Sequence, residues 1–433
     1  MIMNRKKSLV LLLGLLLSAM VWVGLAQKAK AQEPIVIVID PGHGGENRGG
    51  EYEQYVEKEM NPIVAAAMKE ELEKYENVTV YLTHEQDVDM SIKDRVLFAK
   101  EKEADFLFCL HFNMSVNHNL FGAEVWVPAT GEYYAKGRSF AEIEMEAFRE
   151  LGLYSRGIKT RLNDQGENYY GILRYGTQYD VNTVLIEHCH LDQVNDQPFY
   201  QKGEEQLREF GIMDATAVAK YFHLKSEILG VDYSDYPVPE TKVLETIVRP
   251  DMTEPETCQI KVTDINEEKG EVTIEISAED SDSYILYYDY SLDGGQSFSE
   301  LQPWPMGEKI GTSLDHCSFT VSVPYEEEIS IVVNAYNGYD LFTRSNVVFL
   351  QALPDPEKEA LKQKELKEQE RRKAQESYEE IHYDDTTLAE TKEASPDRWR
   401  VAAVIVLILL CMIFVTLFMA ARIEKLLRHK RKK

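Results

Sequence analysis

Apolar residues follow two different spacings in the first half of the chain. Residues 35–39 form a continuous apolar run, which is typical of a buried strand, and residues 61–75 carry apolar side chains three and four positions apart, as on one face of a helix. We expect further strands at residues 78–82, 106–110, 123–127 and 183–186, and further helices at residues 91–103, 134–151 and 204–222. Strands that alternate with helices predict an α/β domain over residues 32–229, with a mostly parallel sheet flanked by helices.

A different pattern begins after a predicted linker at residues 230–257. The helical spacing disappears, and short apolar or alternating runs are separated by turn signals such as Asp293-Gly294-Gly295 and Asn337-Gly338. These features predict a small all-β sandwich over residues 258–353, for which an immunoglobulin- or fibronectin-like topology is one subtype that fits. Residues 354–398 are rich in Lys and Glu and have no apolar face, so we expect a charged linker, either a solvated helix or an extended spacer.

The two ends of the chain carry signals for export and anchoring. Basic residues precede an apolar run, and Ala29-Lys30-Ala31 offers a cleavage site, so residues 1–31 are predicted to be a signal peptide; an uncleaved anchor is the alternative and gives the same topology. Residues 399–421 are predicted to be a transmembrane helix, because about 20 apolar residues suffice to cross a bilayer. The basic tail at residues 422–433 then lies in the cytoplasm. We expect the folded domains to be exported and held at the outer face of the cell membrane.

Composition narrows the classes of function. The net charge of −27 and the pI of about 4.8 argue against a nucleic-acid partner, because phosphate binding requires clustered Lys and Arg side chains. Five cysteines in a chain of 433 residues do not form a disulfide framework, although Cys258 and Cys317 could pair if the β-sandwich brings them together. The classes of function that remain are an exported enzyme and an exported binding protein.

Candidate catalytic residues follow the ends of the predicted strands. His43 lies in a Gly-rich turn directly after the first strand, and His111 ends the strand at residues 106–110, while Glu57 opens the first helix. Two imidazoles and one carboxylate form a three-ligand zinc set that leaves a position open for water, whereas a lone His in such a turn is often structural. Glu187 ends another buried strand, where a carboxylate beside a metal can take the proton of bound water.

Several motifs occur together in one order along the chain. They are Asp40 to Gly45, Glu57 to Asn61, Leu110-His111-Phe112-Asn113, Gly122-Ala123-Glu124-Val125, Arg156-Gly157 and Val184 to Glu187. In order and spacing, residues 34–223 resemble the zinc-dependent N-acetylmuramoyl-L-alanine amidases of family 3. The resemblance implies Zn²⁺ bound by His43, Glu57 and His111, with Glu187 as the catalytic carboxylate. It also implies peptidoglycan as the substrate, cut at the amide between N-acetylmuramic acid and L-alanine.

The sequence departs from this family around the catalytic carboxylate. Glu187 is followed by His188-Cys189-His190, where the family usually continues with small or apolar residues. Strand alternation places His188 and His190 on the face opposite Glu187, so a supporting or surface role is expected, unless a twist at the strand end brings His190 to the site as an extra ligand. His84 stands where the family commonly has Arg, which puts a substrate contact there in doubt. Arg95 and Asn113 are interpreted as structural hydrogen-bonding residues near the site.

Two other functions remain open. The same zinc site could hydrolyse another amide or peptide bond of the cell wall, because metal ligands define hydrolysis better than they define specificity. Alternatively, the chain could be a degenerate, non-catalytic membrane-anchored protein that binds or senses the wall. The β-sandwich could bind wall glycan or a partner protein, and its sequence does not select between them.

Overall fold

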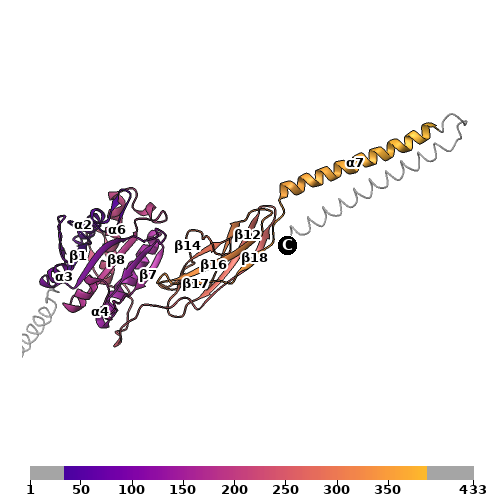
Figure 1. Ribbon diagram of the computed structural model, residues 1–433. Helices are drawn as coiled ribbons and strands as arrows, with labels where there is room; N and C mark the ends of the chain where they lie inside the picture. Colours follow the sequence, from indigo (N-terminus) through magenta and orange to yellow (C-terminus); the bar gives the residue numbers. More distant parts are fainter. Residues whose placement is uncertain (1–33, 388–433) are drawn as a thin grey trace, which may run out of the picture. The chain divides into compact units, whose positions relative to one another are not determined.

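The computed structural model describes residues 34–387, so the expected signal peptide, transmembrane helix and basic tail lie outside the described range. The chain divides into two compact units that meet between Pro354 and Asp355. The first unit contains an α/β domain (residues 35–221) and an all-β domain (residues 257–350), here called the β-domain (Figure 1). No helix within residues 34–387 is both long and apolar enough to span a bilayer.

The α/β domain is built on a six-stranded sheet with the order β4-β1-β5-β8-β6-β7. Its strands are β1 (Ile35–Pro41), β4 (Val78–Leu82), β5 (Phe106–Asn113), β6 (Ala123–Trp126), β7 (Ser155–Lys159) and β8 (Thr183–His190). Four of the five pairings are parallel, and β6 runs antiparallel to β8. The sheet is therefore mixed, although its larger part is parallel, as the alternating strands and helices predict.

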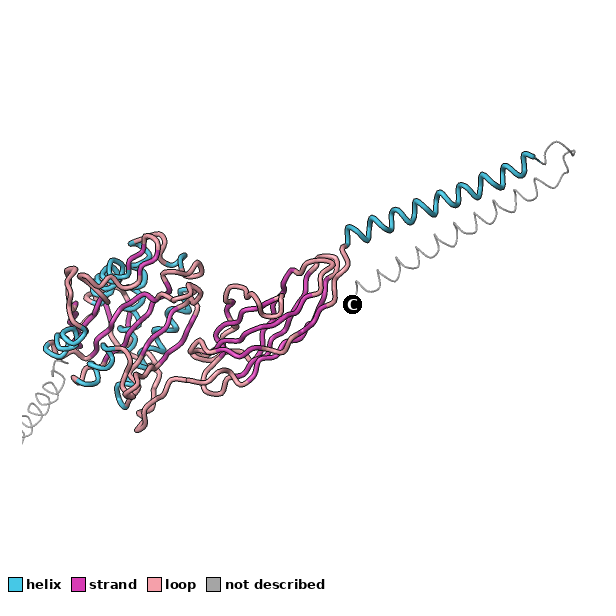
Figure 2. Tube along the Cα trace, viewed as in Figure 1, coloured by secondary structure: helices cyan, strands magenta, loops and turns pink. Residues whose placement is uncertain are grey.

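Helices cover both faces of this sheet, as Figure 2 shows. One face packs against α2 (Glu57–Leu72), α4 (Gly131–Leu151) and α6 (Glu204–Tyr221), and the other against α3 (Ile92–Glu101) and α5 (Gly171–Gln178). The two apolar layers include Phe108 and Leu110 on the first face and Leu107 and Cys109 on the second. Because side chains alternate along a strand, His111 lies on the same face as Cys109.

Two elements of this domain, strand β7 and helix α5, were not predicted from the sequence pattern. Strand β7 has the sequence Ser-Arg-Gly-Ile-Lys, which lacks an apolar alternation because its buried Arg156 and Lys159 are paired with a carboxylate rather than packed in a core. Helix α5 is only 8 residues long and contains Gly171 and Gly176, which are poor helix formers. Two short hairpins, β2 (Glu51–Tyr52) with β3 (Tyr55–Val56) and β9 (Lys225–Ser226) with β10 (Val231–Asp232), complete the domain.

The β-domain consists of two antiparallel sheets that share one apolar core. The first sheet has β11 (Thr257–Asn266), β12 (Glu271–Glu279) and β15 (His316–Ser322); the second has β13 (Ile285–Ser291), β14 (Gln302–Pro303), β16 (Ile329–Asn337), β17 (Phe342–Arg344) and β18 (Val348–Leu350). Cys258 and Cys317 are buried free thiols, so the considered disulfide is absent from the described residues. The immunoglobulin- or fibronectin-like subtype stays a prediction.

The second compact unit begins with a single helix, α7 (Pro356–Thr387). Its described side chains up to residue 378 are almost all exposed, and Lys362 pairs with Glu359 and Arg372 with Glu368 along its surface. We expected the charged linker to be either a solvated helix or an extended spacer. Over these residues it is a helix. Surface pairs of this kind add only a few tenths of a kcal/mol each.

Candidate metal and catalytic site

His43 is presented by a tight loop after β1. Its φ is 68°, and the two glycines that follow also have positive φ values, so the chain turns sharply at this point. The imidazole Nδ1 lies 3.0 Å from Oδ1 of Asn47, and the backbone oxygen of His43 accepts a hydrogen bond of 2.6 Å from Arg95. Because Asn47 Oδ1 can only accept, Nδ1 is the donor of this hydrogen bond. The bond orients the ring so that Nε2 is the nitrogen directed at Glu57.

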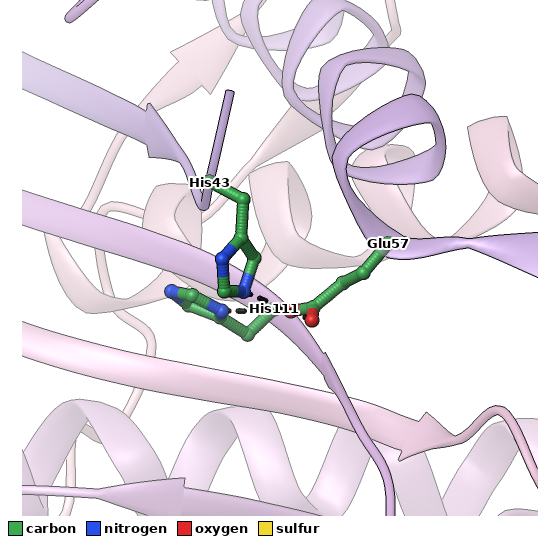
Figure 3. Close-up of side chains that lie close together, drawn as sticks. All are labelled: His43, Glu57 and His111. Atoms are coloured by element: carbon green, nitrogen blue, oxygen red, sulfur yellow. Dashed lines mark hydrogen bonds and ion pairs between the residues drawn. The ribbon is translucent and has the colours of Figure 1, made fainter. Parts of the chain in front are cut away.

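Glu57 lies at the first position of α2, and its side chain is almost fully buried. Its carboxylate accepts hydrogen bonds from the backbone N–H groups of Gly50 and Phe112, at 2.7 Å and 3.1 Å. Gly50 precedes the helix and Phe112 belongs to β5, so these bonds tie the start of α2 to the end of that strand. The carboxylate is thereby fixed between the two histidines (Figure 3).

His111 projects from the carboxyl end of β5 toward the same point. Its Nδ1 lies 2.7 Å from one oxygen of Glu57, while Nε2 of His43 lies 2.9 Å from the other oxygen. The two imidazole rings meet edge to face with centroids 4.8 Å apart. One ligand atom from each of the three residues lies within 4.8 Å of the others. The structure therefore brings the predicted ligands His43, Glu57 and His111 together as a group that could hold a metal ion.

A glycine makes this approach possible. A Cβ atom at Gly42 would lie 2.3 Å from the imidazole of His111, which is far inside van der Waals contact. The Asp40-Pro41-Gly42 segment therefore passes directly over the ring. Nδ1 of His188 also lies 2.9 Å from the backbone oxygen of His111, so the end of β5 is held from both sides.

The charges of the three residues reinforce one another. Burial would raise the pKa of Glu57, but hydrogen bonds from His111 and His43 outweigh it and hold the pKa well below its usual range. For His43, burial alone would lower the pKa, and the hydrogen bond and negative charge of Glu57 raise it above the ordinary value instead. The carboxylate is therefore ionised at neutral pH and can neutralise part of the charge of a bound cation.

Glu187 lies next to this group on the neighbouring strand. It is paired in register with His111 of β5, and it faces Glu124 of β6 on its other side. One carboxylate oxygen is buried and has no hydrogen-bond partner among the described residues. Burial and then the negative charges of Glu57 and Glu124 raise the pKa of Glu187 well above its ordinary value. A buried carboxylate that can hold a proton near neutral pH is suited to general acid and base catalysis.

Glu124 is a buried residue of the site for which no role was predicted from the sequence. Its oxygens accept hydrogen bonds from Arg156, Lys159 and Asn113, at 2.9 Å, 2.8 Å and 2.9 Å. Burial would raise its pKa, but the charges of Arg156 and Lys159 outweigh burial and hold the pKa well below the usual range. Glu124 is therefore a permanent anion, in contrast to Glu187. A charged residue inside the apolar run at residues 123–127 was the signal that could have revealed it.

The histidines after Glu187 are both buried, so a surface role is wrong for each. His188 lies on the face opposite Glu187, as alternation predicts, and its Nε2 lies 3.0 Å from Asp214 of α6. The pairing of β5 with β8 then shifts by one residue, so that His190 pairs with Asn113. This bulge returns His190 to the face of Glu187, where its Nδ1 lies 3.1 Å from the backbone oxygen of Gly122. It does not join the metal-binding group.

The other predicted supporting residues are close to the site. Arg95 donates hydrogen bonds to the side chain of Asp40 and to the backbone oxygens of Pro41 and His43, so its structural role is confirmed. Asn113 is confirmed in the same role through Glu124. Nε2 of His84 lies 3.1 Å from the oxygen of Pro41, so the ring supports the loop before His43.

Two cavities open beside the group. The smaller, of about 160 Å³, is lined by His43, His111 and Tyr170. The larger, of about 640 Å³, is lined by Glu124, His190 and Tyr170 on the α/β domain and by Tyr339 to Leu341 on the β-domain. Tyr170 borders both, so the two spaces are neighbours on the edge of the sheet where the histidines lie.

Comparison with known proteins agrees with this arrangement. Residues 37–217 match the family described as N-acetylmuramoyl-L-alanine amidase. The match covers most of the α/β domain, which is called the amidase domain from here on. The group of His43, Glu57 and His111, Glu187 and the larger part of the sheet all lie within the matched residues.

The relatives are similar to a part of this chain. The N-acetylmuramoyl-L-alanine amidase AmiC of Escherichia coli O6:H1 is 33% identical over 105 residues, which are 24% of this chain and 25% of AmiC. The amidase LytC of Bacillus subtilis is 29% identical over 168 residues, or 38% and 32% of the two chains. The chain thus spans about a quarter to a third of these relatives. The uncharacterized protein YqiI of Bacillus subtilis is 29% identical over 189 residues, with 42% and 87% covered.

Solved structures are similar to less than half of the chain. The catalytic domain of the amidase CwlV from Bacillus (Paenibacillus) polymyxa var. colistinus has 24% identity and a TM-score of 0.37, with 44% of this chain and 99% of that chain covered. An N-acetylmuramoyl-L-alanine amidase from Clostridium difficile 630 has 26% identity and a TM-score of 0.37, with 43% and 97% covered.

Proposed function

We propose that this protein is a zinc-dependent N-acetylmuramoyl-L-alanine amidase that hydrolyses peptidoglycan. The bond cut is the amide between the lactyl group of N-acetylmuramic acid and L-alanine. The observation that carries the proposal is the pairing, in register, of a buried and unpartnered carboxylate, Glu187, with a residue of a His-Glu-His group. The match of residues 37–217 to the family described as N-acetylmuramoyl-L-alanine amidase supports the choice of bond.

The donor set fits zinc. Two imidazole nitrogens and one carboxylate are the ligands of open catalytic zinc sites, in which a further position remains for water. Nδ1 of His43 is held by Asn47, so Nε2 is the nitrogen that a divalent cation would bind on loss of its proton, and the ionised state of Glu57 favours such a cation. A zinc ion held by His43, Glu57 and His111 would polarise the amide carbonyl and make water a better nucleophile.

Glu187 performs the proton transfers in this mechanism. Its carboxylate accepts a proton from the attacking water and then donates it to the nitrogen of the leaving L-alanine, so the same group is used as base and as acid. Its raised pKa suits the second half of this cycle, because an acid with a pKa far below the working pH would not return the proton. Glu57 and the ring of His43 stay fixed through Gly50, Phe112 and Asn47 while the proton moves.

Digestion of purified peptidoglycan tests the proposal. The zinc-loaded full chain should release stem peptides and create new free amino groups on L-alanine, which amino-group labelling followed by hydrolysis identifies. Glu187→Gln is the matched control, since it keeps the shape of the side chain and removes its basicity. Bound zinc without any new L-alanine amino group would refute the amidase proposal.

The same digest separates the alternatives. A hydrolase of another wall bond would expose an amino group on a different residue, and this outcome would keep the zinc chemistry while replacing the substrate bond. A non-catalytic wall-binding or sensory protein would sediment with peptidoglycan and release nothing. The unpartnered carboxylate of Glu187 favours the catalytic proposals, because a buried acid without a partner costs stability and contributes nothing to binding alone.

The location proposed for this activity is the outer face of the cell membrane. The apolar stretches at the two ends of the sequence support export and a single C-terminal anchor, with the basic tail in the cytoplasm. Protease treatment of intact protoplasts should digest the amidase domain and protect an epitope placed after residue 433. Protection of the amidase domain would contradict this topology.

A further inference from the structure

The β-domain and the amidase domain share a buried cluster. Phe121 and Tyr154 of the amidase domain pack with Leu286, Tyr287 and Leu301 of the β-domain, and most of these side chains are almost inaccessible to solvent. Tyrosine hydroxyls donate hydrogen bonds across the interface in both directions. Tyr154 donates to the backbone oxygens of Leu286 and Trp304, and Tyr287 donates to that of Phe121. The two domains are therefore joined by apolar packing and by specific hydrogen bonds.

Arg156 of β7 lies between this contact and the catalytic carboxylates. Its Nε donates to Glu124 at 2.9 Å, its Nη1 to the hydroxyl of Tyr287 at 3.0 Å and its Nη2 to Asp340 at 2.9 Å. Only 3% of its side-chain surface is exposed. A buried guanidinium is stable only when carboxylates and other acceptors satisfy its donors. Two of the three side chains that satisfy Arg156 belong to the β-domain.

Glu124 connects Arg156 to the two strands that carry the site. It lies directly opposite Glu187 in the pairing of β6 with β8, and its other oxygen accepts a hydrogen bond from Asn113 at the end of β5. Glu124 thus contacts or faces both strands that carry the site. If Arg156 shifts, Glu124 must follow or lose its ion pair, and the strand end that carries Glu187 loses a fixed neighbour.

We propose that the β-domain is a working part of the active site, in which Tyr287 and Asp340 are positioning residues that fix Glu187 through Arg156 and Glu124. This inference rests on the proposed amidase function. Tyr287 and Asp340 do not touch the reacting atoms, so their loss changes the alignment of the proton transfer and leaves the metal ligands in place. A misplaced catalytic group lowers kcat with little change in KM, because the error appears in the transition state.

The test uses the full chain, purified in detergent, with zinc bound and a soluble disaccharide-tetrapeptide as substrate. Tyr287→Phe removes one hydroxyl, and Asp340→Asn removes one charge and keeps the shape. We expect each to lower kcat about three- to tenfold with KM within about twofold of the wild type and with unchanged zinc content. The double variant should lose less than the product of the two single losses, because both act through Arg156.

Tyr154→Phe is the matched control. It removes a tyrosine hydroxyl from the same interface, but the bonds lost go to backbone oxygens and not to Arg156. We expect a lower melting temperature with unchanged kcat. An equal loss of kcat in Tyr154→Phe, or full kcat in both Tyr287→Phe and Asp340→Asn, would overturn the positioning role.

Hydrogen exchange gives a second readout that does not require activity. Amide exchange at residues 187–190, followed by mass spectrometry, should be faster in Tyr287→Phe and Asp340→Asn than in the wild type, and unchanged in Tyr154→Phe. An inactive wild type with this exchange pattern would overturn the proposed function and retain the positioning role. Unchanged exchange in all three variants would overturn the positioning role.

Discussion

Two buried glutamates that face each other across β6 and β8 should respond in opposite ways to the same substitution. Glu187 has an unpartnered oxygen and negative neighbours, whereas Glu124 has hydrogen bonds from Arg156, Lys159 and Asn113. Glu187→Gln replaces an acid whose ionisation the site disfavours by a neutral amide, which recovers about 1.4 kcal/mol for each pH unit by which the solution exceeds the ordinary pKa, up to the folded-state pKa. Glu124→Gln breaks a buried ion pair and leaves cations uncompensated, which typically costs about 3–5 kcal/mol.

The raised pKa of Glu187 determines how the gain in stability from Glu187→Gln depends on pH. The raised pKa of Glu187 means that the folded wild type holds a proton that the unfolded chain releases above the ordinary value of 4.5. Wild-type stability therefore falls as pH rises from about 4.5 toward the folded-state pKa, and Glu187→Gln escapes this loss. The stability difference between variant and wild type should grow over that window.

Thermal unfolding of chelator-treated protein measures both effects without a metal that would balance the charges. A domain of this size shifts its melting temperature by about 2–4 °C per kcal/mol, so Glu187→Gln should melt several degrees higher than the wild type at pH 7. Glu124→Gln should melt lower or fail to fold. Zinc-loaded Glu187→Gln should also lose about 100-fold or more in kcat, the usual contribution of a general acid and base. A Glu187→Gln variant that melts below the wild type, or that keeps its kcat, would refute the reasoning.

Other predictions concern the metal-binding group. His43→Ala and His111→Ala should each abolish zinc retention after gel filtration, measured by elemental analysis, while circular dichroism stays unchanged; retained stoichiometric zinc would contradict the ligand assignment. Asn47→Ala removes the hydrogen bond that orients His43, so zinc affinity should fall about 10–100-fold in a competition titration with a chromogenic chelator. Gly42→Ala would place a methyl group 2.3 Å from the ring of His111, so this ring must move and zinc affinity should fall at least as far. If Gly42→Ala bound zinc with the affinity of the wild type, the prediction would be wrong, because the loop and not the ring of His111 would have moved.

The regular part of the fold was accessible from the sequence because its periodicity is strong. The strand at residues 78–82 is observed within the expected bounds, and the expected helix at 204–222 corresponds to α6 (Glu204–Tyr221). The main strand missed in the amidase domain is β7, in which charge pairing replaces apolar packing. A hydropathy pattern detects a buried strand only when its buried side chains are apolar. Because Arg156 and Lys159 are buried as ion pairs, the sequence of this strand resembles that of a loop.

The site was predictable to the extent that it follows strand ends. His43, Glu57 and His111 meet because parallel strands bring their carboxyl ends to one edge of the sheet. The position of His190 was not predictable, since a one-residue bulge reverses the face assigned by alternation. The charge of Glu124 inside an apolar run marks this residue in the sequence, but its connection to the β-domain was not predictable, because its partner Arg156 donates to Tyr287, 131 positions further along the chain.

The shared cluster around Phe121 and Tyr287 bears on how such a chain can be inherited. Along the sequence the two domains look like separable cassettes joined by a linker, and recombination between genes commonly exchanges such segments. An amidase domain transferred alone would arrive with Phe121 uncovered and with Arg156 deprived of two of its three side-chain partners. We therefore expect the two segments to be inherited together, and we expect substitutions at Tyr287 and Asp340 to occur together with changes at Arg156.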